Sequence, residues 1–556
     1  MKVRPVYIYC LILAITGFMR GAESNAAPDA VYFHGKVYTV DDRLGERSAF
    51  AVRGDRIVAV GSDKQILAMA GKSTQRVDLG DAAVIPGMSD AHDHFWNAWR
   101  YLIRGVDMVG VNSRAELEAR LRVAVSKAKP GEVVFTTVGW VVQPALTRKD
   151  LDQISDSIPI VLIADRKGRS TVNGAALKRL GISKNNPAFR GVQVPVDKNG
   201  EPTGGSPDYP LSVRFVEDLL PPLATAQQDE IVKEAEDQCH ALGITAVRDL
   251  AAWSEEVTTL ERLRREGKLT LRIALGLEFP DQKDLPAYIE KQPALQHNDP
   301  WLYVDSQSEE PWSPGSATEE EFTRLVRAEN RAGWRPAPHI SSDPHRGTTA
   351  DQATDDALVA YEAANRDSSI VGKRWYVEHV PFATPAQINR MAALGLIVSV
   401  QDAGYDLPAV APLPPDRMAH WNPVREFLDQ KIVVVAGSDY HGPDPATRDP
   451  NNPIIDFYFY VTRRTRSGEV QTPTEKISRD EALRILTYNE AYATFQENVR
   501  GKIAPGMLAD FVILNQNLMT VPEDQILFTR AVATYVGGIR VYEAPASANM
   551  GIAQKP

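Results

Sequence analysis

The sequence predicts an α/β fold in which a (β/α) barrel carries a small β-module formed near the ends of the chain. Short apolar segments alternate with amphipathic segments of helical period through the middle of the chain. Short strands broken by glycine and aspartate turns occur near both termini. With 556 residues, of which 43% are hydrophobic, the chain can bury one large core and a smaller module beside it.

The first 27 residues have the pattern of a secretory signal peptide. Lys2 and Arg4 precede an apolar run over residues 6–18, and small residues follow at Ala26 and Ala27. This run of about 13 residues is shorter than the roughly 20 that a membrane-spanning helix needs. We therefore expect cleavage, a periplasmic or secreted protein, and no stable membrane span after cleavage.

The β-module is expected from two distant parts of the chain. Residues 28–85 contain DAVYFHGKVYTVDD and AFAVRGDRIVAVGS, in which short strands alternate with Gly and Asp turns. The same texture returns over residues 499–545, in GKIAPGMLADFVIL and AVATYVGGIRVYEA. An isolated pair of strands is only marginally stable, so we expect the two parts to pair in one sheet.

Residues 86–498 are expected to form the barrel. The predicted strands are nearly continuous in apolar residues, which is typical of parallel strands buried on both faces. They cover residues 133–140, 158–164, 244–250, 269–277, 374–380, 395–401 and 431–439. Helices are predicted at residues 229–243, 319–333, 354–367 and 384–395, and a capping box at Ser478 and Glu481 opens a further helix.

Histidines lie at several predicted strand ends, where the active site of a (β/α) barrel is built. His92 and His94 are two residues apart, so an extended chain points both imidazoles to one side. His339, His379 and Asp439 also finish apparent strands. Imidazoles with one carboxylate form a ligand set suited to zinc or a similar divalent ion. Most of the other histidines are expected to be solvated or structural: His34, His240, His297, His345, His420 and His441.

The charge of the chain limits its partners. The net charge is -10 and no segment concentrates basic residues, so a nucleic-acid partner is not expected. The substrate is therefore expected to be a small molecule. Cleavage of the signal would remove Cys10 and leave Cys239 alone, so no internal disulfide is expected.

Nine further motifs occur in a specific order and spacing along nearly all of the mature chain. They are HGKVYTVDD (34–42), PGMSDAHDH (86–94), VNGAALKRLGI (172–182), DKNGEPTGG (197–205), GITAVRDL (243–250), HISSD (339–343), VEHVPFATPAQINRMAALGLIVSVQ (377–401), GSD (437–439) and GKIAPGMLADFVIL (501–514). In these motifs the chain resembles the metal-dependent amidohydrolase superfamily, and within it the branch that contains the N-substituted formamide deformylases.

The resemblance implies a (β/α)8 TIM-like barrel with insertions over residues 86–498. It also implies a composite β-sandwich from residues 28–85 and 499–545, with a tail at 546–556. The implied reaction is hydrolysis of a C–N bond of the amide type by a metal-activated water. Asp439 would take the proton of this water and pass it to the leaving group. The implied metal ligands are His92, His94, His339, His379 and Asp439.

One departure from the family concerns the number of metal ions. Many relatives carry a lysine whose carbamylated side chain bridges two metals, but the corresponding segment here, DPWLYVDSQSEEPW (299–312), contains no lysine. We therefore expect about one zinc-like ion per chain. Asp305, Glu309 and Glu310 are the carboxylates that could take the place of the lysine.

Other departures concern the expected substrate pocket. HISSD lacks the glycine that is usual in this motif, and Gly168 stands near the place of a histidine that is common in relatives. Trp312, Tyr405 and His441 are expected in loops above the metal, where they would suit a compact substrate with an apolar or aromatic part.

Two other classes of function stay open on the same scaffold. The first is a different metal-assisted reaction, such as ester or lactone hydrolysis, hydration or isomerisation. The second is a non-catalytic binding protein that retains its metal. A homodimer is one candidate for the oligomeric state.

Overall fold

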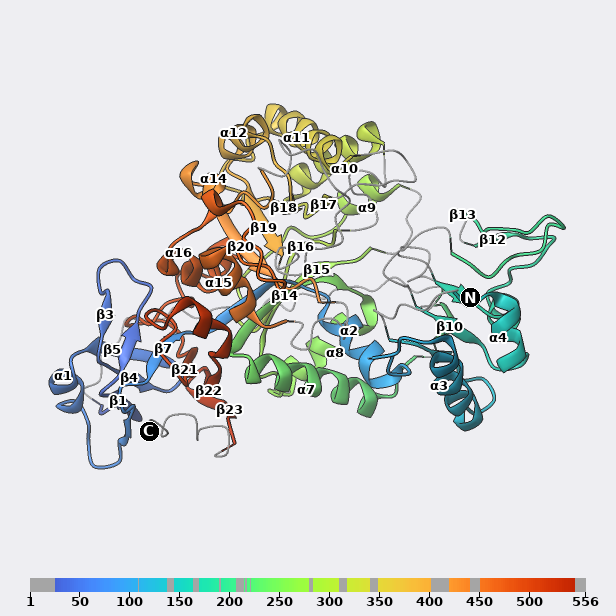
Figure 1. Ribbon diagram of the computed structural model, residues 1–556. Coiled ribbons are helices and arrows are strands. Elements are labelled where there is room, and N and C mark those ends of the chain that lie inside the picture. The colour runs from blue at the N-terminus through green and yellow to red at the C-terminus, as the bar shows by residue number, and fades with distance from the viewer. Residues whose placement is uncertain are drawn as a thin grey trace.

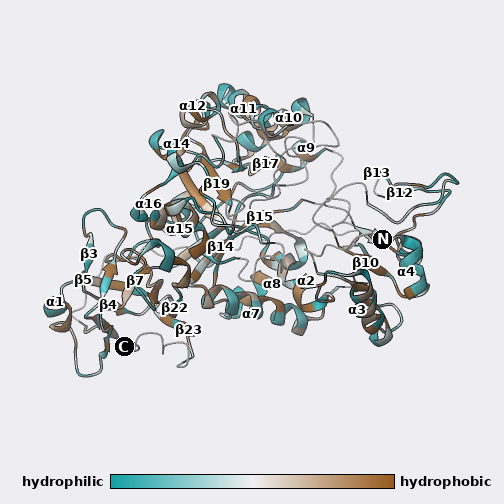
Figure 2. Ribbon diagram, viewed as in Figure 1, coloured by the Kyte–Doolittle hydropathy of each residue, from teal (hydrophilic) through white to brown (hydrophobic). Residues whose placement is uncertain are grey.

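The computed structural model of the chain describes residues 26–108, 110–137, 145–163, 170–189, 192–206, 215, 218–220, 222–279, 284–309, 318–340, 349–401, 420–440 and 451–545. The chain is an α/β protein with two parallel sheets at its centre, helices on their outer sides, and further strands at one end (Figure 1). The central strands are mostly hydrophobic, whereas the outer helices present hydrophilic residues as well (Figure 2). Among the described helices, none combines the length and the hydropathy that crossing a membrane requires.

Each central sheet contains four parallel strands. The first has the order β16-β15-β14-β8 and the second the order β17-β18-β19-β20. The strands of the first sheet are β8 (Met88–Asp93), β14 (Ile244–Ala252), β15 (Arg272–Leu277) and β16 (Leu302–Gln307). Those of the second are β17 (His339–Ile340), β18 (Tyr376–His379), β19 (Ile397–Gln401) and β20 (Val433–Gly437). Five of the seven predicted strands are confirmed here, as β14, β15, β18, β19 and β20.

The two central sheets meet along both of their edges. On one side, the backbone N–H of Asp439 donates to the carbonyl of His92 at 2.8 Å, and Asp93 forms a parallel bridge with Tyr440. On the other side, the N–H of Gln307 donates to the carbonyl of Arg335 at 3.0 Å. The carboxyl ends of all these parallel strands therefore face the same side of the molecule.

Gly437 is required where β20 passes β8. A Cβ at this position would lie 2.2 Å from the backbone N of His92 and 2.6 Å from its Cβ. Only glycine lets the two backbones approach this closely. The glycine of the GSD motif therefore sets the distance between Asp439 and the histidines of β8.

Amphipathic helices cover the outer faces of the central sheets, as the sequence predicts. The four predicted helices are confirmed as α7 (Thr225–Ala241), α10 (Glu319–Ala332), α11 (Ala350–Asp367) and α12 (Pro385–Leu394), and the structure adds α8 (Ser254–Arg265) and α14 (Val424–Asp429). The apolar sides of α10, α11, α12 and α14 meet the strands in a core that contains Tyr361 and Trp375, and those of α7 and α8 meet them in a second core that contains Ile231 and Leu260. The capping box predicted at Ser478 and Glu481 is confirmed at the start of α16 (Arg479–Ile485).

The two ends of the chain pair in one sheet, which confirms that sequence prediction. The sheet has six strands in the order β23-β22-β21-β7-β2-β3, and β21 pairs antiparallel with β7. Its strands are β2 (Lys36–Tyr38), β3 (Glu46–Arg47), β7 (Ala83–Pro86), β21 (Phe511–Leu514), β22 (Ala531–Val536) and β23 (Ile539–Glu543). A second sheet has the order β5-β4-β1-β6, formed by β1 (Ala30–Phe33), β4 (Ala49–Arg53), β5 (Arg56–Gly61) and β6 (Gln75–Asp78). Aromatic rings fill the space between the sheets, with Tyr32 and Phe50 from one and Phe511 and Tyr535 from the other.

A buried ion pair joins the six-stranded sheet to the central strands. Arg272, at the start of β15, donates to both carboxylate oxygens of Asp510 at 2.6 and 2.8 Å. Both residues are at most 4% exposed, and the guanidinium also lies 4.4 Å from the ring centroid of Trp301. This bidentate geometry compensates the cost of burying both charges.

The predicted strands at 133–140 and 158–164 do not belong to the central sheets. They appear as β9 (Val134–Phe135) and β10 (Ile160–Leu162), in a separate sheet with β11 (Thr171–Val172). This sheet has its own cores against α3 (Arg114–Lys127), α4 (Arg148–Ile154) and α5 (Gly174–Arg179). Buried strands of any sheet have the same apolar pattern, so the pattern alone could not assign these two.

The motif VNGAALKRLGI has a structural role in this inserted part. Asn173 caps α5 by accepting from the N–H of Ala176, and the same side chain accepts from the N–H of Ile160 in β10. Its amide nitrogen donates to the carbonyls of Ser155 and Ile158. The motif therefore fixes a helix to a strand within the insertion.

Candidate metal centre

The five predicted ligands come together at the carboxyl ends of the central strands. His92 lies in β8 and His94 just after it, His339 begins β17, His379 ends β18, and Asp439 follows β20. Asp439 Oδ1 lies 3.4 Å from His92 Nε2 and 3.2 Å from His94 Nε2. His339 Nδ1 and His379 Nε2 are 2.8 Å apart.

Glu309 lies between these two groups of residues. Its Oε1 is 3.3 Å from His94 Nε2, and its Oε2 is 2.9 Å from His339 Nδ1 and 3.3 Å from His379 Nε2. One candidate metal site contains Glu309 with His92, His94 and Asp439, and a second contains it with His339 and His379. Within each site the ligand atoms lie within 4.8 Å of one another. Glu309 Oε1 thus faces the first site, whereas Oε2 faces the second and also lies 3.7 Å from His92 Nε2.

The structure distinguishes between two of the three acids that could replace the bridging lysine. Glu309 is only 6% exposed and faces the histidines. Asp305 is instead held by ion pairs to Arg335 and Arg248. Glu310 lies outside the described residues. The sequence points to Glu309 only weakly, through its position two residues beyond the end of β16.

The backbone near two of the ligands is strained. His379 and Asp439 have φ of 68° and 54°, in the left-handed region that residues other than glycine seldom adopt. Asp90 fixes the residue that precedes Asp439, because its carboxylate accepts from the N–H of Ser438 at 3.0 Å and from the Ser438 hydroxyl at 2.5 Å. The same carboxylate accepts from the N–H of His92 at 3.2 Å. Asp90 therefore ties the SDAHDH and GSD motifs together.

Burial differs among the ligands in a way that defines the open side of the centre. The His92 side chain is fully buried, while those of Asp439 and His339 are 28% and 34% exposed. A small molecule can therefore approach from the side of Asp439 and His339. His92 is the deepest ligand.

The ionisable groups of the centre shift one another's pKa values. Burial lowers the pKa of His92, but Glu309, Asp439 and Glu378 outweigh burial and raise this pKa well above its usual value. Burial raises the pKa of Glu309, but His339 and His92 outweigh it and hold this pKa well below the usual range. The carboxylates thus stabilise positive charge on the imidazoles, and a bound divalent cation would supply that charge in place of the protons.

A further observation, at His92, indicates that these residues suit a metal ion. His92 Nε2 is completely buried and makes no hydrogen bond to any described residue. Its Nδ1 lies 2.8 Å from Glu378 Oε2, so a proton on Nδ1 is donated to that carboxylate. With a cation bound, Nε2 would be left to offer its lone pair to that cation between Glu309 and Asp439. A buried lone pair facing carboxylates suits a ligand to a divalent cation.

The predicted pocket residues Trp312, Tyr405 and His441 lie outside the described residues, as do Gly168 and most of the HISSD motif. Four of the other histidines are described and have partners of their own. His34 is 3.1 Å from Asp78, and His420 is 2.9 Å from Glu426. His240 contacts the carbonyl of Ile244 and the hydroxyl of Thr270, and His297 is 3.3 Å from Asp305.

Comparisons with known proteins agree with this arrangement. The amidohydrolase family matches residues 75–542 of the chain. The chain is 25% identical to the N-substituted formamide deformylase of Arthrobacter pascens, over 93% of this chain and 99% of that protein. It is 24% identical to the protein Long After Far-Red 3 of Arabidopsis thaliana, over 92% and 91% of the two chains. The crystal structure of an uncharacterized metal-dependent hydrolase from Pyrococcus horikoshii superposes with a TM-score of 0.67 at 19% identity, covering 89% of this chain and 99% of that one.

Proposed function

The chain belongs to the amidohydrolase family and is a metal-dependent hydrolase acting on C–N bonds, and from this premise we propose that it cleaves an amide-type bond in a small molecule with a metal-activated water. The convergence of His92, His94, Glu309 and Asp439 on one point carries the proposal. N-substituted formamides are the first substrates to test, because a relative that matches along almost its whole length is named for them.

The roles of the residues follow from their positions. His92, His94, Glu309 and Asp439 would hold a divalent cation, which supplies Lewis acidity and lowers the pKa of water toward about 7. Asp439 accepts the proton of the attacking water, because its carboxylate lies on the open side of the centre. It then donates this proton to the departing nitrogen. The deeper His92 and His94 take no part in proton transfer.

We further propose that one zinc ion is held tightly by the four-residue site. The expectation of about one ion per chain rests on the missing bridging lysine, with Asp305, Glu309 and Glu310 as possible replacements. Glu309 now offers a carboxylate to His339 and His379 as well, so a second and weaker ion is expected at excess zinc. Elemental analysis should give about one zinc per chain after dialysis and more than one before it. In Glu309→Gln the second ion should be lost first.

The finer fold follows from the same family. We propose that the eight central strands form one closed (β/α)8 barrel over residues 86–498, supported by the backbone contacts at both seams. Residues 28–85 and 499–545 would form the composite β-sandwich, supported by the pairing of β7 with β21. Residues 1–27 would be a cleaved signal, which makes the protein periplasmic or secreted.

Two substitutions distinguish the residue that carries the proton from a residue that only binds the metal. Asp439→Asn keeps the size and one oxygen but cannot accept a proton near neutral pH, so kcat should fall by about 10² or more while most of the zinc stays. His92→Ala should lose the zinc itself, since it removes the deepest ligand. An Asp439→Asn enzyme with near-normal kcat would rule out this residue as the proton carrier.

A panel of formamides, other amides, esters and lactones tests the type of reaction. Turnover of amides above esters supports the proposal. Turnover of esters or lactones alone would assign the ester-hydrolase alternative. A zinc-loaded chain that turns over none of them would leave a hydratase, an isomerase or a binding protein, and would refute hydrolysis of a C–N bond.

A further inference from the structure

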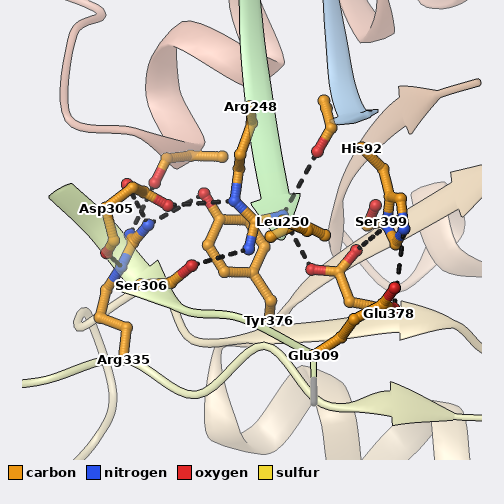
Figure 3. A network of polar contacts seen from close by, with 12 residues as sticks. His92, Arg248, Leu250, Asp305, Ser306, Glu309, Arg335, Tyr376, Glu378 and Ser399 are labelled. Atoms are coloured by element: carbon orange, nitrogen blue, oxygen red, sulfur yellow. Dashed lines mark hydrogen bonds and ion pairs between the residues drawn. The ribbon is translucent and has the colours of Figure 1, made fainter. Parts of the chain in front are cut away.

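A charged network runs through the interior of the protein beneath the metal centre (Figure 3). Arg248 of β14 is completely buried and donates to Glu378 Oε1 at 2.8 Å, to Asp305 Oδ2 at 3.1 Å and to the hydroxyl of Ser306 at 3.2 Å. Burying an arginine costs much free energy unless its charge is paired. Such a network therefore needs a reason beyond filling space.

The charges of the network balance. Arg335 lies 2.5 Å from Asp305 Oδ1, so the two arginines face the two carboxylates of Asp305 and Glu378. The ring of Tyr376 separates the guanidinium groups, which lie 3.6 and 4.6 Å from its centroid. The network thus contains two positive and two negative side chains. Glu378 is therefore a carboxylate anion, and Arg248 fixes one of its two oxygens.

The other oxygen of Glu378 reaches the metal centre. Glu378 Oε2 lies 2.8 Å from His92 Nδ1, on the side of the imidazole opposite Nε2. Ser399 of β19 also hydrogen-bonds to this carboxylate (Figure 3). Glu378 is therefore held by β14 and β19 while it accepts the Nδ1 proton of a histidine on β8. Its two oxygens are used by two different donors.

We propose that Glu378 and Arg248 are positioning residues for the metal ion, and that they act through His92. Arg248 fixes the Glu378 carboxylate, the carboxylate fixes the tautomer and ring orientation of His92, and His92 Nε2 is thereby presented to the cation. This inference rests on the proposed function, since it requires a metal at His92. It adds two residues that touch neither the metal nor the substrate.

Glu378→Gln tests the inference by metal affinity rather than by activity. An amide offers one oxygen where the carboxylate offers two, so either Arg248 or His92 Nδ1 would face an NH2 group. The zinc affinity of the purified full chain, measured by competition with a chromophoric chelator, should fall by about 10- to 100-fold. The apparent zinc affinity of the wild-type chain is the reference.

Glu490→Gln is the matched control. Glu490 is also a buried carboxylate in a bidentate pair, in this case with Arg500, and it is 1% exposed. Its replacement should lower the melting temperature but leave the zinc affinity unchanged. A purely structural role of Glu378 predicts the same behaviour for Glu378→Gln.

Ser399→Ala provides a milder second variant if Glu378→Gln does not fold. It removes one hydrogen bond to the carboxylate and should weaken zinc binding several-fold in the same direction. Wild-type zinc affinity in Glu378→Gln, or in Ser399→Ala where only this variant folds, would overturn the inference and leave the proposed function intact. A wild-type chain that binds no zinc would refute both.

Discussion

Gly437→Ala should damage the metal centre although residue 437 binds nothing. The new Cβ would lie 2.2 Å from the backbone N of His92, whereas ordinary van der Waals contact begins at 3.4 Å. The obstacle is backbone, which cannot rotate away as a flexible side chain could. Strands β20 and β8 must therefore separate by roughly 1 Å, because a packed interior has no free space to absorb the methyl group.

The separation changes the relation between Asp439 and the histidines of β8. It weakens the hydrogen bond from the N–H of Asp439 to the carbonyl of His92, which is 2.8 Å long. A misplacement of about 1 Å between reacting groups costs roughly 10²-fold in rate. We therefore expect kcat/KM of the zinc-loaded variant to fall by about 10²-fold, and stability to fall by about 1–3 kcal/mol from overpacking.

The assay combines turnover of a formamide, zinc content and thermal unfolding on one preparation. Gly205→Ala is the control, because its Cβ would meet nothing closer than the Thr203 hydroxyl at 3.7 Å. The control should keep wild-type values in all three measurements. A folded Gly437→Ala enzyme with wild-type kcat/KM and zinc content would refute the reasoning that this contact sets the geometry of the centre.

Three further predictions concern stability and specificity. Asp510→Ala leaves Arg272 buried without its partner and should cost about 3–5 kcal/mol in chemical denaturation; a loss below about 1 kcal/mol would contradict the role of this pair. Burial raises the pKa of Glu236 from 4.5 to about 7 despite the N–H groups that it accepts from, so its contribution to stability is full below pH 4.5 and is lost as pH rises through 7. Glu236→Gln should therefore match the wild type at pH 4 and be up to about 3 kcal/mol more stable at pH 8; equal differences at both pH values would count against this. Trp312→Ala or Tyr405→Ala should change KM and the preference among substrates while zinc content stays the same, and unchanged selectivity in both variants would mean that the pocket lies elsewhere.

The helices and most of the central strands could be predicted because local patterns encode them. A helix such as α10 has apolar residues at helical spacing and a capping residue at Thr318. Strands such as β20 are apolar throughout, as is typical of strands buried on both faces. The same patterns could not decide which sheet a strand joins, and so β9 and β10 were expected among the central strands but belong to the insertion.

The sequence by itself determined which residues could ligate a metal. His92 and His94 point to one side because they alternate along a strand, and His339, His379 and Asp439 stand where other predicted strands end. Such spacing is a local property of the chain. It follows from the period of the backbone and needs no knowledge of distant contacts.

Only the tertiary structure decided which acidic residues enter the centre and what they do there. Glu309, Asp305 and Glu310 are nearly equivalent in the sequence, yet Glu309 meets the histidines while Asp305 pairs with two arginines. Glu378 stands next to a predicted ligand but contacts His92, which lies 286 positions away in the chain. Long-range partners are set by how strands from distant segments pack, and the direction of a buried carboxylate is set by whichever cations and donors that packing places around it.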